Sequence, residues 1–186
     1  EIPSGYDADD DGICDNANYS DLCAVIMSSG LSNIKSIEAH GSNLTAVLHN
    51  NGHINAWGDN GNGQCDIPND LQGNVEQLST AGNFMIALLD DGTVTGWGAS
   101  NNNHFDFPDD SELENVVKVE AGAGHGFSFA LKSDGTIVGW GNNYYGQLSG
   151  SGTCTSNCYD VAEFSDDIQG NVADISLGSG YGVVLL

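Results

Sequence analysis

A repeated unit of about 41 residues is the feature that most constrains what this chain can fold into. The pair Asn-Ile or Asn-Val starts each unit, at Asn33, Asn74, Asn115 and Asn171. The first two steps are 41 residues long and the third is 56, so the third unit contains an insertion. The expected units are 33–73, 74–114, 115–170 with an insertion at 148–170, and an incomplete unit at 171–186. In such arrays each unit packs only against its neighbours.

Each unit has the pattern of a small antiparallel sheet. An alternating segment such as "NVVKVEA" leads through a glycine break into an apolar segment such as "FMIAL". A turn dipeptide follows, at Asn51-Gly52, Asp91-Gly92 and Asp134-Gly135. These dipeptides favour the two-residue type I′ turn of a β-hairpin. The returning segment then ends in Trp-Gly, at Trp57-Gly58, Trp97-Gly98 and Trp140-Gly141.

The Trp-Gly pairs are interpreted as structural positions. One small sheet cannot bury both of its faces, whereas several sheets packed side by side can, with aromatic side chains between them. The alternative is a tryptophan that stacks on a ligand in every unit.

The fourth unit ends in "GVVLL", residues 182–186, where the other units continue to Trp-Gly. This predicts an apolar strand whose hairpin partner is not in the chain, and an unpaired strand edge invites intermolecular pairing. Two explanations stay open. Either the chain is a fragment of a longer array of such units, or a neighbouring subunit completes the sheet.

The repeats resemble those of the regulator of chromosome condensation family. The resemblance covers residues 33–186 and rests on "GNFMIALLDDGTVTGWG", "GHGFSFALKSDGTIVGWGNNYYGQL" and "WGDNGNGQCDIP". The second unit departs from the family pattern, with Asn103-His104 in place of Gly-Gln. The resemblance implies a β-propeller with blades of about four strands, usually closed into a ring. The expected fold class is therefore all-β, with three complete blades, the start of a fourth, and an incomplete ring.

The charge balance restricts the partners. There are 26 acidic residues against three Lys and Arg, and the net charge is -23. Binding to DNA or RNA backbones requires clustered Lys and Arg, so nucleic acid is not an expected partner, and anionic membranes are disfavoured. Two interpretations of the acidity stay open: a surface adapted to salty or calcium-rich water, or a specific basic partner. The chromatin role of the family is not carried over, because the basic surface that it requires is missing.

Residues 1–30 form an acidic segment that is expected to bind calcium. In "DADDDGICD" the carboxylates alternate before a glycine, as in calcium loops whose oxygen ligands converge on the cation. The candidate ligands are Asp7, Asp9, Asp11, the Ile13 carbonyl, Asp15 and Asp21. An EF-hand would have Glu where Asn18 stands, so the segment more closely resembles thrombospondin type 3 repeats. The alternative is a solvated acidic linker.

The five cysteines indicate the compartment. Cys14 and Cys23 lie close in sequence, as do Cys154 and Cys158, which predicts two local disulfides and an oxidising environment. The alternative is a cytosolic protein with five free thiols. Cys65 is expected to be a buried thiol inside a blade. Asn18 and Asn43 stand in N-glycosylation sequons, and no apolar run is long enough for a membrane span.

The sequence favours a non-enzymatic role. The chain begins at Glu1, which fits a cleaved secretion signal or a chosen boundary. None of the usual nucleophile or phosphate-binding motifs is present. The expectation is an extracellular calcium-binding structural or adhesive module, as part of a surface protein or a self-assembling filament. A protein partner or self-association through 182–186 is expected, and the 148–170 insertion is a candidate contact surface. The alternatives are a secreted binding propeller, of inhibitor or lectin type, and an enzyme.

Overall fold

A computed structural model describes residues 33–39, 44–99, 105, 107–108, 111–123, 126–143, 146–148, 164 and 168–186. Every regular element in these residues is a β-strand. No helix in this part has the length and apolarity needed to cross a membrane. The predicted calcium ligands, the cysteines of both predicted disulfides and the asparagines of both sequons lie outside the described residues.

The strands form four antiparallel sheets, one for each sequence unit, which we call blades one to four. Blade one contains β1 (Ile34–Glu38), β2 (Leu44–His49) and β3 (Ile54–Gly58). Blade two contains β4 (Val75–Thr80), β5 (Phe84–Leu89) and β6 (Val94–Gly98). Blade three contains β7 (Val116–Gly122), β8 (Phe127–Lys132) and β9 (Ile137–Gly141). Blade four contains only β10 (Asp174–Leu177) and β11 (Gly182–Leu185).

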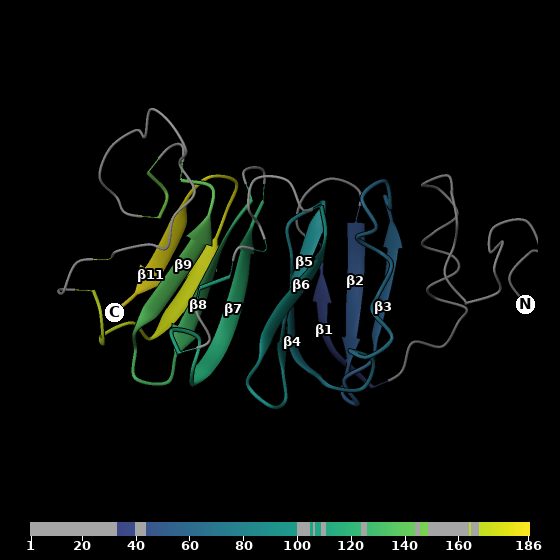
Figure 1. The fold of residues 1–186 in the computed structure, drawn as a ribbon, viewed down its shortest axis with the longest axis horizontal. Coiled ribbons are helices and arrows are strands. Elements are labelled where there is room, and N and C mark those ends of the chain that lie inside the picture. The colour runs from purple at the N-terminus through teal and green to yellow at the C-terminus, as the bar shows by residue number, and fades with distance from the viewer. Residues whose placement is uncertain are drawn as a thin grey trace, which may run out of the picture.

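The blades stand side by side in sequence order, and they do not close into a ring (Figure 1). In each complete blade the middle strand pairs with both of its neighbours, in the order β1-β2-β3 and its equivalents. The predicted fold class is confirmed: three complete blades and the start of a fourth. Each of the three complete blades has three strands in the described residues, whereas the resemblance implied about four.

The hairpin turns differ from the prediction. A type I′ turn needs positive φ at both central residues, but the described non-glycine residues with positive φ are Asn33 and Asn115, outside these turns. The Gly52 amide donates to the His49 carbonyl at 3.0 Å, and the His49 amide donates to the His53 carbonyl at 2.8 Å. This is a three-residue loop that ends in a glycine at φ 77°, as in a type I turn with a bulge.

The acidic residue of the turn dipeptide therefore has a different role from the one expected. The Oδ1 of Asp91 accepts a hydrogen bond from the Thr93 amide at 2.9 Å, and Asp134 accepts one from Thr136 at 2.9 Å. A short side chain that accepts from the backbone two residues later stabilises a turn without positive φ. These hydrogen bonds lower the pKa of both carboxyls below its usual value.

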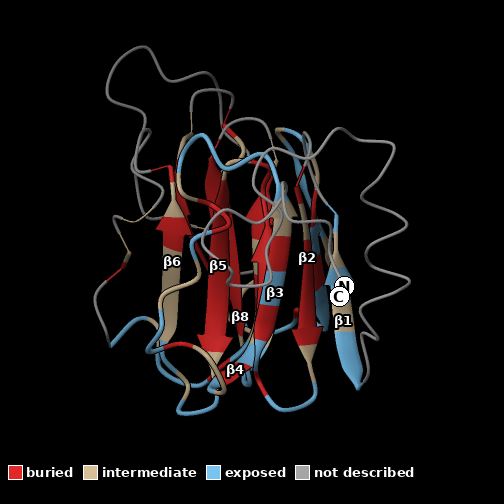
Figure 2. Cartoon of the chain, turned by 90° about the vertical axis from the view of Figure 1, so that its right-hand side faces the viewer, coloured by how far each residue is buried: buried red, intermediate tan, exposed pale blue. Residues whose placement is uncertain are grey.

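Hydrophobic cores lie between blades, at surfaces that we call junctions. One cluster joins blade one to blade two, a second joins blades two and three, and a third joins blades three and four. The middle strands are buried on both faces, whereas β1 at the end of the row is largely exposed (Figure 2). Stability in such an array comes from neighbour-to-neighbour contacts rather than from one central core.

The Trp-Gly pair is explained by backbone crowding next to a junction. Trp97 packs in the core between blades one and two, and Trp140 packs in the next core. Gly98 follows with φ 104°, and a Cβ built there would lie 2.7 Å from the Asn83 carbonyl oxygen. No larger residue fits without a shift of the backbone, so glycine must follow the tryptophan.

Candidate functional site

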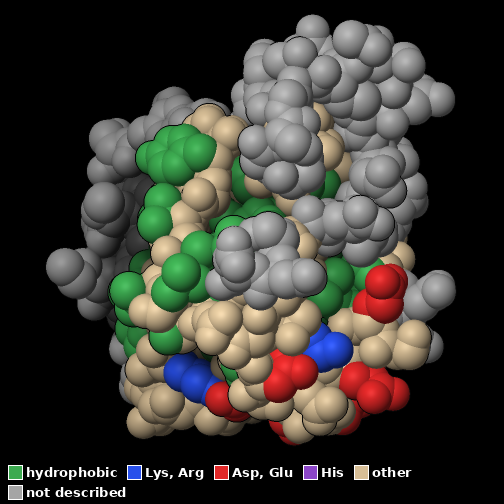
Figure 3. Space-filling view, turned by 90° about the vertical axis from the view of Figure 1, so that its left-hand side faces the viewer, with side chains coloured by type: hydrophobic (Ala, Val, Ile, Leu, Met, Phe, Trp, Pro, Cys, Tyr) green, Lys and Arg blue, Asp and Glu red, His purple; other side chains and the backbone are tan. Residues whose placement is uncertain are grey.

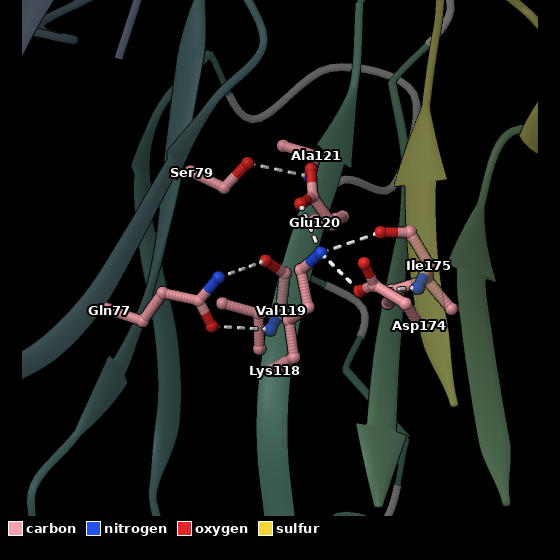
Figure 4. A network of polar contacts seen from close by, with 8 residues as sticks. All are labelled: Gln77, Ser79, Lys118, Val119, Glu120, Ala121, Asp174 and Ile175. Carbon is pink, nitrogen blue, oxygen red and sulfur yellow. Dashed lines mark hydrogen bonds and ion pairs between the residues drawn. The ribbon is translucent and has the colours of Figure 1, made fainter. Parts of the chain in front are cut away.

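The first strands of the blades, β1, β4, β7 and β10, face one another across the junctions. Their hydrogen-bond registers place one side chain of each strand at the same position, which we call the bridging position. Its occupants are Ser36, Gln77, Lys118 and Asp174. Figure 4 shows the polar contacts that start from this position in blades two to four.

Gln77 joins blade two to blade three. Its side-chain carbonyl accepts from the Val119 amide at 2.9 Å, and its side-chain amide donates to the Val119 carbonyl at 3.2 Å (Figure 4). The side chain thus makes the pair of hydrogen bonds that a neighbouring strand would make. Ser79 adds a bond across the same junction, because its Oγ accepts from the Ala121 amide at 3.0 Å.

Lys118 joins blade three to blade four. Its Nζ donates to the Ile175 carbonyl at 2.7 Å and to Asp174 Oδ1 at 2.6 Å, and it lies 3.2 Å from Glu120 Oε1. Burial alone would lower the pKa of Lys118, but its bonds to Asp174 and Glu120 outweigh burial and raise that pKa. The bond from Lys118, helped by one from the Ile175 amide, lowers the pKa of Asp174.

Two of the three lysines of this acidic chain stand where blades meet. Lys35 of β1 lies 2.7 Å from Glu76 of β4, and Lys118 bridges β7 and β10. The chain has only three Lys and Arg in total, so two of them are engaged at junctions. These cations neutralise carboxylates that adjacent first strands bring close together.

The bridging position of blade one is different. The Ser36 hydroxyl is buried and has no hydrogen-bond partner among the described residues. Serine is shorter than glutamine or lysine, which explains why it makes no bond of the kind that Gln77 makes to Val119. The junction between blades one and two therefore lacks this side-chain bridge.

The loops after the Trp-Gly pairs are built on buried side chains. Asn60 Oδ1 accepts from the Cys65 amide at 2.8 Å, and Asn143 Oδ1 accepts from the Leu148 amide at 2.9 Å in the equivalent loop. Cys65 and Leu148 occupy the same buried position, so Cys65 acts as a small apolar residue. Burial, followed by the nearby carboxylates of Asp66 and Asp59, raises the pKa of Cys65 to about 12.

Cys65 is thus a buried free thiol, as expected. A thiol with so high a pKa is protonated at neutral pH and is a poor nucleophile or metal ligand. The same loop carries a link to the next blade, because the Trp97 Nε1 donates to the Gln64 carbonyl at 3.0 Å. This part of the chain is structural.

Blade four exposes an apolar surface whose equivalent positions are buried in the other blades. We call Tyr181, Val183 and Leu185 the outer face. Their exposed fractions are 63%, 59% and 62%. By register they correspond to Phe84, Ile86 and Leu88 of blade two, whose exposed fractions are 0%, 0% and 4%. Figure 3 shows apolar side chains gathered on this end of the row.

The three tryptophans that were predicted to be structural differ in burial. Trp97 and Trp140 are buried, and the Trp140 ring lies 5.6 Å from the ring of Phe107. Trp57, in blade one, is only half-buried. In the described part of the chain no three His, Cys, Asp or Glu side chains gather as they would around a metal ion.

The bridging residues were not singled out from the sequence. Gln77, Lys118 and Asp174 stand at one position of the aligned repeats, four residues from each starting pair when the Asn is counted as the first. A polar residue that recurs at this position, directly before an apolar residue, was the available signal. The bonds themselves join residues up to 57 positions apart, so local pattern does not reveal them.

Sequence and structure comparisons agree on the repeat type. Residues 34–64 and 116–147 match the family model of the regulator of chromosome condensation (RCC1) repeat. No curated protein sequence matches the chain significantly. Among solved structures, human WBSCR16 is similar, with 22% identity over 78% of this chain and 43% of that chain, and a TM-score of 0.57.

Two further structures extend the comparison. Prp20p of Saccharomyces cerevisiae aligns with 20% identity over 82% of this chain and 41% of its own, with a TM-score of 0.58. The CRINKLY WD40 ectodomain of the Arabidopsis thaliana receptor kinase ACR4 aligns with 19% identity over 78% and 43%, with a TM-score of 0.50. This chain spans less than half the length of each structure, and the likeness shows the fold.

Proposed function

We propose that this chain, whose repeats are of the RCC1 type, is a non-enzymatic protein-interaction module that acts as a calcium-binding structural or adhesive subunit outside the cell. The observation that carries the proposal is the outer face of blade four. Three adjacent apolar side chains are exposed there, although the same positions are buried in the other blades. A patch of this kind marks an interaction site.

The polar groups of the row support a structural role. Gln77, Ser79 and Lys118 make hydrogen bonds across junctions. Their side chains hold blades together, and the tryptophans of blades two and three are packed in the cores. Among the described residues, the outer face is the apolar surface that stays open to a partner.

A protein is the proposed partner class. Solved propellers of this fold include yeast RCC1 (Prp20) bound to Kap60, and a study of Prp20p describes its binding to Gsp1p and histones. Those partners belong to the yeast protein. For the present chain, the net charge of -23 argues against nucleic acid and favours cationic or protein ligands.

The extracellular and calcium-dependent parts of the proposal rest on the sequence. The Asp7–Asp21 segment carries the alternating carboxylates of a calcium loop, and four cysteines stand in two close pairs. The ACR4 neighbour is itself an ectodomain, so a propeller of this fold exists outside a cell. We propose that calcium orders the segment that precedes blade one.

Calorimetric titration with calcium tests this proposal. The unaltered chain is expected to bind calcium, and the double variant Asp9→Asn, Asp11→Asn is expected to lose that binding, because two ligands lose their charge. Asp70→Asn, which removes a carboxylate from the repeat region, is the matched control and keeps binding. Equal calcium affinity in all three proteins would refute the calcium site.

Electron microscopy of the native material, with and without a chelator, tests the structural role. Assemblies that come apart when calcium is removed support a calcium-dependent subunit. Assemblies that ignore the chelator contradict the calcium dependence. A monodisperse protein that captures a separate partner points instead to a secreted binding propeller.

A further inference from the structure

We infer that the outer edge of β6, in blade two, binds an extended and positively charged segment of a partner protein, which adds to the sheet as a further strand. The binding groups are the backbone amides and carbonyls of Val94 and Gly96, which we call the open edge. The inference rests on the proposed interaction role and names a surface for it. It depends neither on the outer face of blade four nor on calcium.

The strand register turns the groups of the open edge outward. The Leu89 amide donates to the Thr93 carbonyl at 2.8 Å, so these two residues form a hydrogen-bonded pair of the β5–β6 hairpin. Bonded and non-bonded pairs alternate along antiparallel strands, which makes Leu88 and Val94 a non-bonded pair. The amide and carbonyl of Val94, and those of Gly96 two residues later, therefore point away from β5. The described residues form no further strand on that side.

Blades one and three close this position with a glutamine. The Gln72 side chain accepts from the Ile54 amide at 2.9 Å and donates to the Ile54 carbonyl at 3.0 Å. Gln169 makes the same two bonds to Ile137, at 2.9 and 3.0 Å. Ile54 and Ile137 are the register equivalents of Val94. The chain itself thus shows that this position binds an amide group that donates and accepts at once, as a peptide group does.

Blade two lacks such a glutamine. In blades one and three it belongs to a Gln-Gly pair directly before the Asn that starts the next unit, whereas Leu113-Glu114 stands at that place after blade two. Among the described residues, none bonds the outward amide and carbonyl of Val94. The backbone of β6 therefore keeps a donor and an acceptor that the equivalent strands have already used.

The hairpin turn beside the open edge is also uncovered. A Cβ built on Gly52 would lie 2.7 Å from the Gly73 carbonyl carbon, and one built on Gly135 would lie 2.9 Å from that of Gly170. A Cβ built on Gly92, the equivalent glycine of blade two, would meet no atom within 4 Å. The connection to the next blade thus packs against the turn in blades one and three and leaves the turn of blade two accessible.

Burial follows the same division. Ile54 and Ala56 of β3 are 2% and 1% exposed, and Ile137 of β9 is 1% exposed. Val94 and Gly96 are both partly exposed. Figure 2 shows most of β6 in the colour of intermediate burial. The open edge can therefore be reached from outside the molecule.

The chemistry around the open edge selects the partner. β6 contains no proline and no charged residue, which are common devices against strand addition. Residues 74–99 include no Lys or Arg, and Asp90 and Asp91 stand exposed in the turn before β6. An extended peptide gains affinity from main-chain hydrogen bonds to such an edge. Lys or Arg side chains on that peptide would meet the two carboxylates with complementary charge.

An NMR titration of the full, isotope-labelled chain with an octapeptide of alternating threonine and lysine tests the inference. The amide signals of Val94 and Gly96 are expected to shift and their hydrogen exchange to slow, while the already bonded amides of Ile54 and Ile137 stay unchanged. The same peptide N-methylated at every residue is the control, because it has no amide to donate. An unshifted Val94 signal at about 1 mM peptide, or equal binding of the methylated peptide, would overturn the inference.

Two sets of variants separate the backbone bonds from the charge. Val94→Pro removes an outward amide without breaking the ladder to β5 and should weaken peptide binding about 10-fold, whereas Val94→Ala, the matched control, keeps the amide and the binding. The double variant Asp90→Asn, Asp91→Asn keeps the side-chain acceptors of the turn and should also weaken binding, and Asp134→Asn in blade three should not. Circular dichroism checks folding, and the aspartate variants stand alone if Val94→Pro unfolds. Equal affinity in the variants and their controls contradicts binding at this edge.

The same titration in chelator distinguishes this inference from the proposed function. A peptide that binds at Val94 in chelator supports the open edge even where the calcium-dependent role fails. A chain that binds calcium or forms calcium-dependent assemblies, but shows no change at Val94, overturns the open edge alone.

Discussion

The junction between blades two and three and the outer face of blade four carry the same kind of surface in two different states. Phe84 and Ile86 are buried between two blades, whereas Tyr181 and Val183 occupy the same positions and are exposed. Sequence type alone therefore does not decide whether a residue is core or surface. What decides it is the presence of a following blade.

The comparison also shows how the junctions are made specific. Apolar clusters join all four blades, but the bridging position changes from Ser36 to Gln77, Lys118 and Asp174. Apolar packing supplies most of the attraction, and the bridging side chains fix which strand lies opposite which. A row of similar blades needs such directional polar contacts, because apolar packing by itself is not directional.

The largest difference in stability is expected between removing an aromatic ring from the junction of blades two and three and removing one from the outer face of blade four. Phe84→Ala leaves a cavity in a buried core and should lower the free energy of unfolding by about 3–5 kcal/mol. Tyr181→Ala removes an exposed ring and should change it by less than about 0.5 kcal/mol. Urea unfolding at a concentration where the chain is monomeric measures both values. Similar losses in the two variants would show that blade four is covered within the monomer.

The bridging position gives the second contrast. Gln77→Ala leaves the Val119 amide and carbonyl without their partners, and should cost about 1–3 kcal/mol in the free energy of unfolding. Ser36→Ala removes a hydroxyl that makes no such bond and should cost less than about 0.5 kcal/mol. Urea unfolding of the pair is the measurement. An equal cost would mean that Gln77 contributes through packing rather than through its hydrogen bonds.

The blades could be predicted from the sequence because their signals are local. Strand alternation, a turn dipeptide and Trp-Gly recur in each unit of about 41 residues. Each sheet can therefore be predicted from its own stretch of sequence. Cys65 was also predictable, since Leu148 stands at the same place in the loop of the third unit. The type of hairpin turn was predicted wrongly, because Asn51 and its equivalents suit several turns and the side-chain bond to the backbone decides.

The contacts between blades could not be predicted in the same way. Gln77 and Val119 are 42 residues apart, and Lys118 and Ile175 are 57 apart. Their meeting depends on how one sheet packs against the next, which no local pattern encodes. The calcium ligands Asp7–Asp21 and the two cysteine pairs lie outside the described residues, and they stay predictions.

A gain of stability is expected if the missing bridge is supplied. Ser36→Gln gives blade one the side chain that blade two has at this position, and the Leu78 backbone is the equivalent of that of Val119. The new bonds should raise the free energy of unfolding by about 0.5–1.5 kcal/mol. Ser36→Glu is the matched control, because a carboxylate of the same length cannot donate to the Leu78 carbonyl. Equal stability of the Gln and Glu variants would contradict a bridge of this kind.

The smallest effect is expected from acid at the junction of blades three and four. The bond from Lys118 holds the pKa of Asp174 below its ordinary value of 3.8. A carboxyl whose pKa is lowered on folding adds stability that is complete above the unfolded pKa and is lost as pH falls through the folded pKa. The unaltered chain should therefore lose its advantage over Asp174→Asn as the pH falls below about 4.

At neutral pH that advantage should be under about 1 kcal/mol, the range of exposed ion pairs, because Asp174 is largely open to solvent. Urea unfolding of both proteins between neutral and strongly acidic pH measures the difference, which cancels the acid response of the other carboxylates. Asp70→Asn, away from the junction, provides the control. A difference that does not change with pH would contradict a contribution from the charge of Asp174, because the side-chain oxygen in Asp174→Asn can still accept from the Ile175 amide.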